Sequence, residues 1–104
     1  MAREPKLHGL IGLALRSRRV VLGRAACRQA AGRGALHVLI VACDAGAIAG
    51  RETGVLAAVP RVRCELDKRE LGRRAGRMEL ALLGITDRNL AAGVLQAARP
   101  AGDA

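Results

Sequence analysis

The sequence predicts an α/β fold with helices packed on both faces of a small, largely buried sheet. Residues 35–43 (ALHVLIVAC) and 79–86 (ELALLGIT) are continuous apolar runs with β-branched members, which is typical of strands covered on both faces. Segments of helical spacing alternate with these runs from Gly23 onward. Because no linker, repeat or low-complexity segment interrupts the chain, residues 1–104 are expected to form one domain with an ordered core over about residues 5–98.

The first predicted element is an amphipathic helix that ends near Ser17. Pro5 suits its first turn, after a frayed start over residues 1–4. The apolar residues that recur at helical spacing are Leu7, Leu10, Ile11 and Ala14. Arginines at positions 16, 18 and 19 come at the carboxyl end, where cations complement the helix dipole. Residues 20–22 are expected to be a short extended connection.

A second helix is predicted from Arg24 to about residue 31, opened by Gly23 and ended by two glycines. The free backbone N–H groups at its start, beside Arg24 and Arg28, would form an anion site. In the alternative interpretation Gly23 only caps the helix and Arg28 is only solvated. The sequence favours neither.

Two aspartates stand where helices are expected to begin. Asp44 follows the first buried strand, and we expect it to cap a helix over residues 47–58 or, as an alternative, to face a ligand. That helix would bury Ile48, Val55 and Leu56. Asp87 should cap the last helix, over residues 88–98. The buried stripe of the last helix would be Leu90, Val94 and Leu95.

The most basic stretch of the chain is residues 59–77, VPRVRCELDKRELGRRAGR. It begins at Pro60, which suits the entry to an edge strand. Two apolar residues then alternate with two arginines, so one side of a short strand can pack while the other stays wet and cationic. The packed residues would be Val62 and Cys64, and the wet ones Arg61 and Arg63.

A short helix is predicted to begin at Lys68. Asp67 is its expected N-cap, and Glu70, three residues later, completes a capping-box pattern. Gly76 should end the helix in the left-handed conformation. The residues that this helix would bury are Leu71 and Ala75.

The charge of the chain indicates a polyanionic partner. The net charge of +9 and the isoelectric point near 11.4 come almost entirely from arginine, because Lys6 and Lys68 are the only lysines. Guanidinium groups pair bidentately with phosphate and with guanine edges. Arg69 and Arg73 share one face of the predicted helix, with Arg77 just past its end. Nucleic acid is therefore the first partner to consider, and the alternative is that these arginines are solvated surface.

Other residue types exclude several classes of protein. Without Phe, Tyr or Trp the core must be aliphatic, and no aromatic platform for stacking bases exists. The cysteines are odd in number and lie in apolar stretches, so we expect Cys27, Cys43 and Cys64 to be small core residues in a reducing cytosol. No CxxC or HxxxH spacing occurs, so neither a metal nor another cofactor is expected, and His8 and His37 lack a nucleophile pattern. No apolar run is long enough to cross a bilayer, so a membrane partner is not expected.

Four segments follow one known family in order. They are residues 10–23 (LIGLALRSRRVVLG), 36–45 (LHVLIVACDA), 59–76 (VPRVRCELDKRELGRRAG) and 85–91 (ITDRNLA). On these segments the chain resembles the bacterial YlxQ-like branch of the kink-turn-binding ribosomal protein superfamily, the L-seven-Ae and L-thirty-e group, over about residues 7–98. The resemblance implies a three-layer α/β/α sandwich with a four-stranded mixed sheet, and association with RNA or the ribosome.

The family grips kinked RNA at the amino end of its second helix, with a Gly-x-Asn-Glu-x-x-Lys pattern. Gly23 matches this pattern. Ala25, Ala26 and Gln29 stand where the family has Asn, Glu and Lys. The side chains that read tandem sheared G·A pairs in the family are therefore not carried over to this chain.

Three further positions match the family. Lys68 corresponds to the basic residue three positions before a Leu-Gly pair, which makes it a candidate for phosphate contact. Residues 76–79 resemble the RNA-facing loop of the family, although Glu79 is unfavourable beside phosphate. Asp44 matches a family acid at a strand end, where its role is expected to be architectural.

We therefore predict a non-enzymatic protein that binds structured or kink-turn-like RNA, such as rRNA, largely through phosphate contacts and with steep salt dependence. The expected RNA-binding residues are Gly23, Arg24, Arg28, Gln29, Lys68, Arg69, Arg73, Gly76 and Arg77. The protein is expected to be a cytoplasmic monomer that acts in translation, with the ribosome or translation factors as further partners. The alternative is a protein-interaction module on a translation factor or ribosomal protein, without direct RNA readout. Catalysis and duplex DNA binding are disfavoured, because the sequence has neither a catalytic constellation nor a pair of recognition helices.

Overall fold

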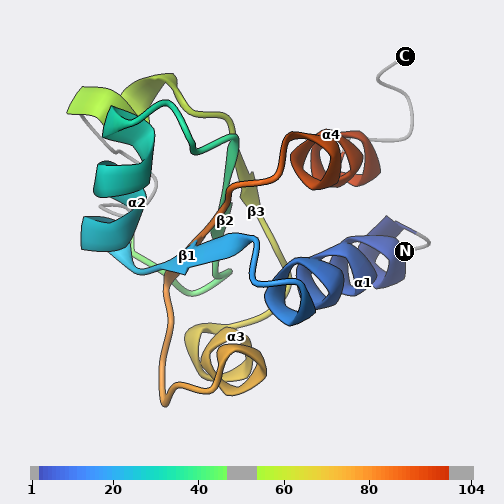
Figure 1. Ribbon diagram of the computed structural model, residues 1–104. Coiled ribbons are helices and arrows are strands. Elements are labelled where there is room, and N and C mark those ends of the chain that lie inside the picture. The colour runs from blue at the N-terminus through green and yellow to red at the C-terminus, as the bar shows by residue number, and fades with distance from the viewer. Residues whose placement is uncertain (1–2, 47–53, 99–104) are drawn as a thin grey trace.

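The computed structural model describes residues 3–46 and 54–98, and the side chains from residue 6 onward (Figure 1). Helices and strands alternate along most of this part of the chain. In chain order the elements are α1 (Arg3–Arg16), β1 (Val20–Leu22), α2 (Arg24–Gly32), β2 (Val38–Val41), the 3₁₀ helix η2 (Gly54–Ala58), β3 (Arg61–Arg63), α3 (Lys68–Ala75), β4 (Leu82–Ile85) and α4 (Arg88–Ala97).

The four strands form one mixed sheet in the order β1-β4-β2-β3. Strand β4 pairs antiparallel with β1 and β2, whereas β2 and β3 run parallel. This arrangement confirms the predicted α/β class and the four-stranded mixed sheet. Residues 20–22 form a strand and not merely a connection, because Val20 pairs with Ile85 and Leu22 with Leu83.

Helices cover both faces of the sheet. In Figure 1, α2 and η2 lie on one side of the strands, and α1 and α4 lie together on the other. Helix α3 contacts α1 and lies below the sheet in this view. The two central strands, β2 and β4, are buried along their whole length, as the continuous apolar runs predict.

Glycine is required at one position inside the core. A Cβ atom at Gly84, in β4, would collide with the side chain of Leu36 and lie 3.0 Å from Cys27 Sγ and from Val21 Cγ2. A side chain at this position would have to displace Leu36, Cys27 or Val21, so glycine leaves the room that these buried and half-buried side chains occupy.

The predicted apolar stripes are buried to different degrees. In α1, Leu7, Ile11 and Ala14 are buried and Leu10 is half-buried, as their spacing predicts. In α4, Val94 is buried, but the expected partners Leu90 and Leu95 are only half-buried. The small residues Ala91 and Ala97 are buried in their place.

Several predicted boundaries are too wide. The first buried strand begins at Val38 and not at residue 35, because the N–H of Ala35 donates to the carbonyl of Ala30 at the end of α2. The second begins at Leu82 and not at residue 79, because the N–H of Leu80 is bonded to α3. These hydrogen bonds hold Ala35 and Leu80, near the start of each predicted strand, outside the sheet.

The helix predicted over residues 47–58 is only partly described, because residues 47–53, Ile48 among them, lie outside the described ranges. Residues 54–58 form the 3₁₀ helix η2. Within it Leu56 is buried as predicted, but Val55 is 52% exposed, so the prediction that Val55 faces inward is wrong. The tighter 3₁₀ winding places successive side chains on different faces from those of an α-helix.

The cysteines follow the prediction at two of three positions. Cys27 and Cys64 are buried, whereas Cys43 is exposed because it lies in the turn that follows β2. Within residues 3–46 and 54–98 no group of three His, Cys, Asp or Glu residues is arranged to hold a metal ion. In the same ranges no helix has the length and apolarity needed to span a membrane.

Candidate functional site

The predicted binding residues come from two segments that meet at one end of the sheet. At this end β1 and β2 finish and β4 begins. The N–H of Gly23, at the start of α2, donates to the carbonyl of Leu82 over 3.0 Å. The N–H of Ala42 donates to the carbonyl of Ala81 over 3.0 Å. The start of α2 therefore lies directly beside the segment that connects α3 to β4.

Helix α3 has the termini that its sequence predicts. The Asp67 carboxylate accepts a hydrogen bond from the N–H of Glu70 over 2.8 Å, and the Glu70 carboxylate accepts one from the N–H of Asp67 over 3.0 Å. This confirms the capping box. Gly76 ends the helix in the left-handed conformation, with φ 78° and ψ 28°, as predicted. Leu71 is buried and Ala75 is half-buried.

Asp44 has a different partner from the one expected. Its Oδ1 atom accepts a hydrogen bond from the backbone N–H of Lys68 over 2.8 Å, which is the first N–H group of α3. This bond supports an architectural role for Asp44. The start of the next helix in sequence, which Asp44 is predicted to cap, lies outside the described residues. The neighbouring N–H of Cys43 donates to the carbonyl of Leu66 over 2.9 Å, which brings the turn after β2 against the start of α3.

The arginines of β3 bind backbone carbonyls. Nη1 of Arg63 donates to the carbonyls of residues 42, 43 and 45 at 3.1, 3.1 and 3.3 Å, and Nη2 of Arg61 donates to the carbonyl of Leu56 at 2.9 Å. The alternation itself is as predicted, since Val62 and Cys64 are buried. On the opposite side Arg63 is exposed, as predicted, and Arg61 is half-buried. Their guanidinium groups in addition hold the turn after β2 and the end of η2 in place.

The loop after α3 is fastened onto the helix itself. The N–H of Arg77 donates to the carbonyl of Gly72 over 2.7 Å, and the N–H of Leu80 donates to the carbonyl of Lys68 over 2.9 Å. A Cβ atom at Gly72 would lie 2.8 Å from the Cα atom of Glu79 and 2.9 Å from the carbonyl oxygen of Arg77. Glycine at this position is thus what allows the loop to lie against the helix.

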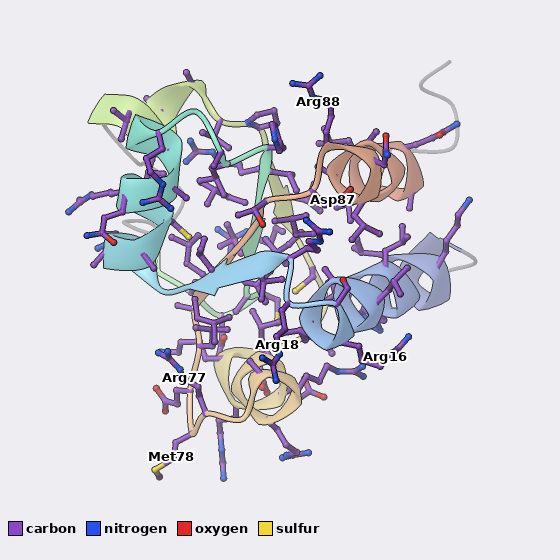
Figure 2. All side chains as sticks on the ribbon, viewed as in Figure 1. Arg16, Arg18, Arg77, Met78, Asp87 and Arg88 are labelled. Carbon is purple, nitrogen blue, oxygen red and sulfur yellow. The ribbon has the colours of Figure 1, made fainter. Side chains whose placement is uncertain are left out.

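A pocket of about 520 Å³ opens between α3 and this loop. It is lined by Arg69, Arg73, Arg77, Met78 and Glu79. The three arginines that the helical spacing places together are therefore brought to one pocket, and all three are exposed. Met78, which the sequence analysis missed, is 93% exposed, and Figure 2 shows it at the tip of the loop with Arg77 beside it. A single methionine next to a turn carries no periodic signal that would reveal it.

The start of α2 forms the other part of the site. Gly23 has φ 86° and ψ 166°, a conformation that is essentially restricted to glycine, so the start of α2 requires glycine for a backbone reason. Arg28 and Gln29 are exposed and Arg24 is half-buried. No acidic residue lies in the first turn of α2, so no carboxylate of that turn competes for its N–H groups.

The site is thus strongly cationic, with a few acids at defined places. Glu79 lines the arginine pocket. Asp67 and Glu70 are engaged by the capping box of α3, and Asp44 by the N–H of Lys68. Such an arrangement offers guanidinium groups and helix N–H groups to an extended anion, together with one exposed thioether.

Comparison with solved structures shows the same fold in other proteins. A Bacillus halodurans protein of unknown function has 24% sequence identity and a TM-score of 0.75, and the match covers 88% of this chain and 95% of that one. A 15.5 kD RNA-binding protein of Giardia lamblia has 20% identity and a TM-score of 0.70, with 94% and 88% covered. No protein-family model and no curated protein sequence matches the chain.

Proposed function

We propose that this protein binds structured RNA, chiefly through its phosphates, and that it has no catalytic role. The observation that carries the proposal is the pocket in which Arg69, Arg73 and Arg77 meet, at the same end of the sheet as the start of α2. All three arginines are exposed. Arg69 and Arg73 lie on a helix with two firm caps, and the N–H of Arg77 is bonded to the carbonyl of Gly72, so they can pair with phosphate without reorganising the backbone.

The fold supports the choice of RNA as the polyanion. The Giardia protein that shares this fold is an RNA-binding protein. The four segments described above resemble the YlxQ-like branch of the kink-turn-binding superfamily, and we propose membership of that branch. The resemblance also supports association with ribosomal RNA or the ribosome in the cytoplasm, where this small basic protein would act as a monomer.

Recognition is expected to depend on backbone more than on bases. Ala25, Ala26 and Gln29 lack the groups with which the family reads G·A pairs, whereas Gly23 preserves the helix start. Arg24 and Arg28 add cations on α2, and the half-buried Lys68 adds one at the start of α3. We therefore expect a modest preference for a kink-turn over a plain duplex, with affinity falling steeply as salt increases.

The decisive experiment measures binding to a kink-turn RNA and to a matched duplex without G·A pairs, each across a series of salt concentrations. The test variant carries Arg69→Gln, Arg73→Gln and Arg77→Gln. Its control carries Arg33→Gln, Arg74→Gln and Arg88→Gln, which remove the same charge from exposed positions that do not line the pocket. Arg74 is the closest match, because it follows Arg73 on the same helix.

The test variant should lose roughly tenfold or more in affinity at about 100 mM salt, and the slope of log affinity against log salt should fall by about 2 to 3. The control should lose much less. Equal losses of RNA affinity in both triple variants would mean that only the total charge matters, and would reject the pocket as the binding site. If the unchanged protein binds neither RNA at moderate salt, the RNA proposal fails and the interaction with a ribosomal protein or translation factor takes its place.

A further inference from the structure

We propose that Arg18 is an additional phosphate-binding residue, which extends the arginine surface of α3 onto the turn between α1 and β1. This inference rests on the proposed RNA-binding function. It concerns a residue that the sequence analysis treated only as a cation at the end of a helix. Arg18 has a backbone conformation that is unfavourable for arginine.

Helix α1 ends in a Schellman motif. The N–H of Arg19 donates to the carbonyl of Ala14 over 2.9 Å, and the N–H of Arg18 donates to the carbonyl of Leu15 over 3.2 Å. This pattern requires a left-handed residue at the position of Arg18, whose φ is 59°. Glycine is the usual residue there, because a Cβ atom makes the left-handed conformation costly.

Elsewhere the chain follows that rule. Among residues 3–46 and 54–98, Arg18 is the only residue other than glycine with a positive φ. The glycines in this region of φ are Gly23, Gly34, Gly54 and Gly76. Gly76 is the closest comparison, because it ends α3 in the same left-handed conformation. An arginine at the matching position of α1 carries a backbone cost that glycine would avoid.

The side chain of Arg18 is not needed to form the turn. The hydrogen bonds that end α1 come from backbone groups and from Ser17, whose Oγ donates to the carbonyl of Leu13 over 2.8 Å. Arg18 itself is exposed. A costly backbone conformation at an exposed residue, whose side chain is not part of the hydrogen bonds that end α1, indicates that the side chain serves another purpose.

The position of Arg18 indicates what that purpose is. Figure 2 shows Arg18 projecting from the end of α1 over α3, on the side of the molecule that also carries Arg77 and Met78. Helix α1, which ends just before Arg18, contacts α3. Arg88 projects from the opposite side of the molecule. We infer that an RNA backbone seated in the arginine pocket of α3 continues toward the end of α1 and reaches Arg18.

The test compares Arg18→Gly, Arg18→Lys and the control Arg88→Gln in RNA binding and in thermal unfolding. Arg18→Gly removes the charge and introduces a residue for which the left-handed φ is favourable. We expect its RNA affinity to fall about threefold or more and its salt slope to fall by about 1. Its unfolding midpoint should stay unchanged or rise, because glycine relieves the left-handed strain. Arg18→Lys should keep most of the affinity, and Arg88→Gln should bind like the unchanged protein.

Three results would overturn the inference. The first is that Arg18→Gly binds RNA as tightly as Arg88→Gln does. The second is that Arg18→Gly lowers the unfolding midpoint, because Arg18 would then be a structural residue of the turn. The third is that Arg18→Lys loses as much affinity as Arg18→Gly. These results differ from a failure of the proposed function, in which the unchanged protein itself would not bind RNA.

Discussion

The Oδ1 atom of Asp44 lies 2.8 Å from the backbone nitrogen of Lys68, a residue 24 positions later in the chain. This hydrogen bond joins the end of β2 to the first turn of the arginine-bearing helix α3. It also gives a negative group to the amino end of that helix, where the helix dipole favours it. The orientation of the arginine pocket therefore depends on a residue that belongs to a different element.

Asp44→Ala should destabilise the protein by about 1 kcal/mol, the usual cost of losing a side-chain cap. RNA affinity should fall as well, because the start of α3 is no longer held to the sheet. Asp44→Asn keeps an acceptor oxygen, so its stability and RNA affinity should lie between those of the unchanged protein and those of Asp44→Ala. Urea unfolding checks the stability, and an unchanged free energy of unfolding in Asp44→Ala would show that the bond has no energetic role.

Gly72→Ala should disturb the loop that carries Arg77 and Met78. The added Cβ atom would lie within 2.9 Å of backbone atoms of Arg77 and Glu79, which cannot move without shifting the loop. We expect a loss of stability of about 1 to 3 kcal/mol and weaker RNA binding. Gly32→Ala is the control, because nothing lies within 4 Å of its Cβ position and alanine favours the helix. Equal behaviour of the two variants would contradict this account of the loop.

Glu79→Gln should increase RNA affinity. Glu79 lines the pocket with three arginines, so its carboxylate repels the phosphate that they attract. Removing the charge should strengthen binding about two- to threefold at low salt, with a smaller gain at high salt because ions screen the repulsion. Glu65→Gln, at an exposed position outside the pocket, is the matched control variant. An affinity that falls in Glu79→Gln would mean that Glu79 positions an arginine and does not oppose the RNA.

Gly23→Ala should destabilise α2 through the backbone alone. Nothing lies within 4 Å of the Cβ position at Gly23, but its φ of 86° and ψ of 166° are unfavourable for alanine. A cost of about 1 to 3 kcal/mol is expected in chemical unfolding. Gly9→Ala, in α1 with the same free space, should instead be neutral or stabilising. If Gly23→Ala is as stable as the unchanged protein, the conformation of the helix start is not what requires glycine there.

Features that depend on a few neighbouring residues could be predicted from the sequence. The capping box of Asp67 and Glu70 spans three residues, and the stop at Gly76 needs only the local backbone, so both are recognisable without knowing the fold. The grouping of Arg69, Arg73 and Arg77 likewise follows from helical geometry. The two central strands were evident from their apolar runs.

Features that depend on distant segments could not be predicted from the sequence. Alternation placed Arg61 and Arg63 opposite the packed side of β3, but it could not show which carbonyl groups lie within reach of these arginines. The bond between Asp44 and Lys68 could not be predicted either, since local reasoning offers Asp44 only the nearest helix in sequence. Whether the pocket binds RNA stays a prediction.

By itself, the sequence determined the α/β class, the aliphatic core, the cationic character and the caps of α3, because each follows from composition or from residues within one turn of one another. Only the tertiary structure decided that the start of α2 and the loop after α3 share one end of the sheet. The reason is that strand pairing fixes Gly23 beside Leu82 and Ala42 beside Ala81, through contacts between residues far apart in the chain. Long-range hydrogen bonds of this kind have no local signal, and here they bring the arginine pocket of α3 and the start of α2 to the same end of the sheet.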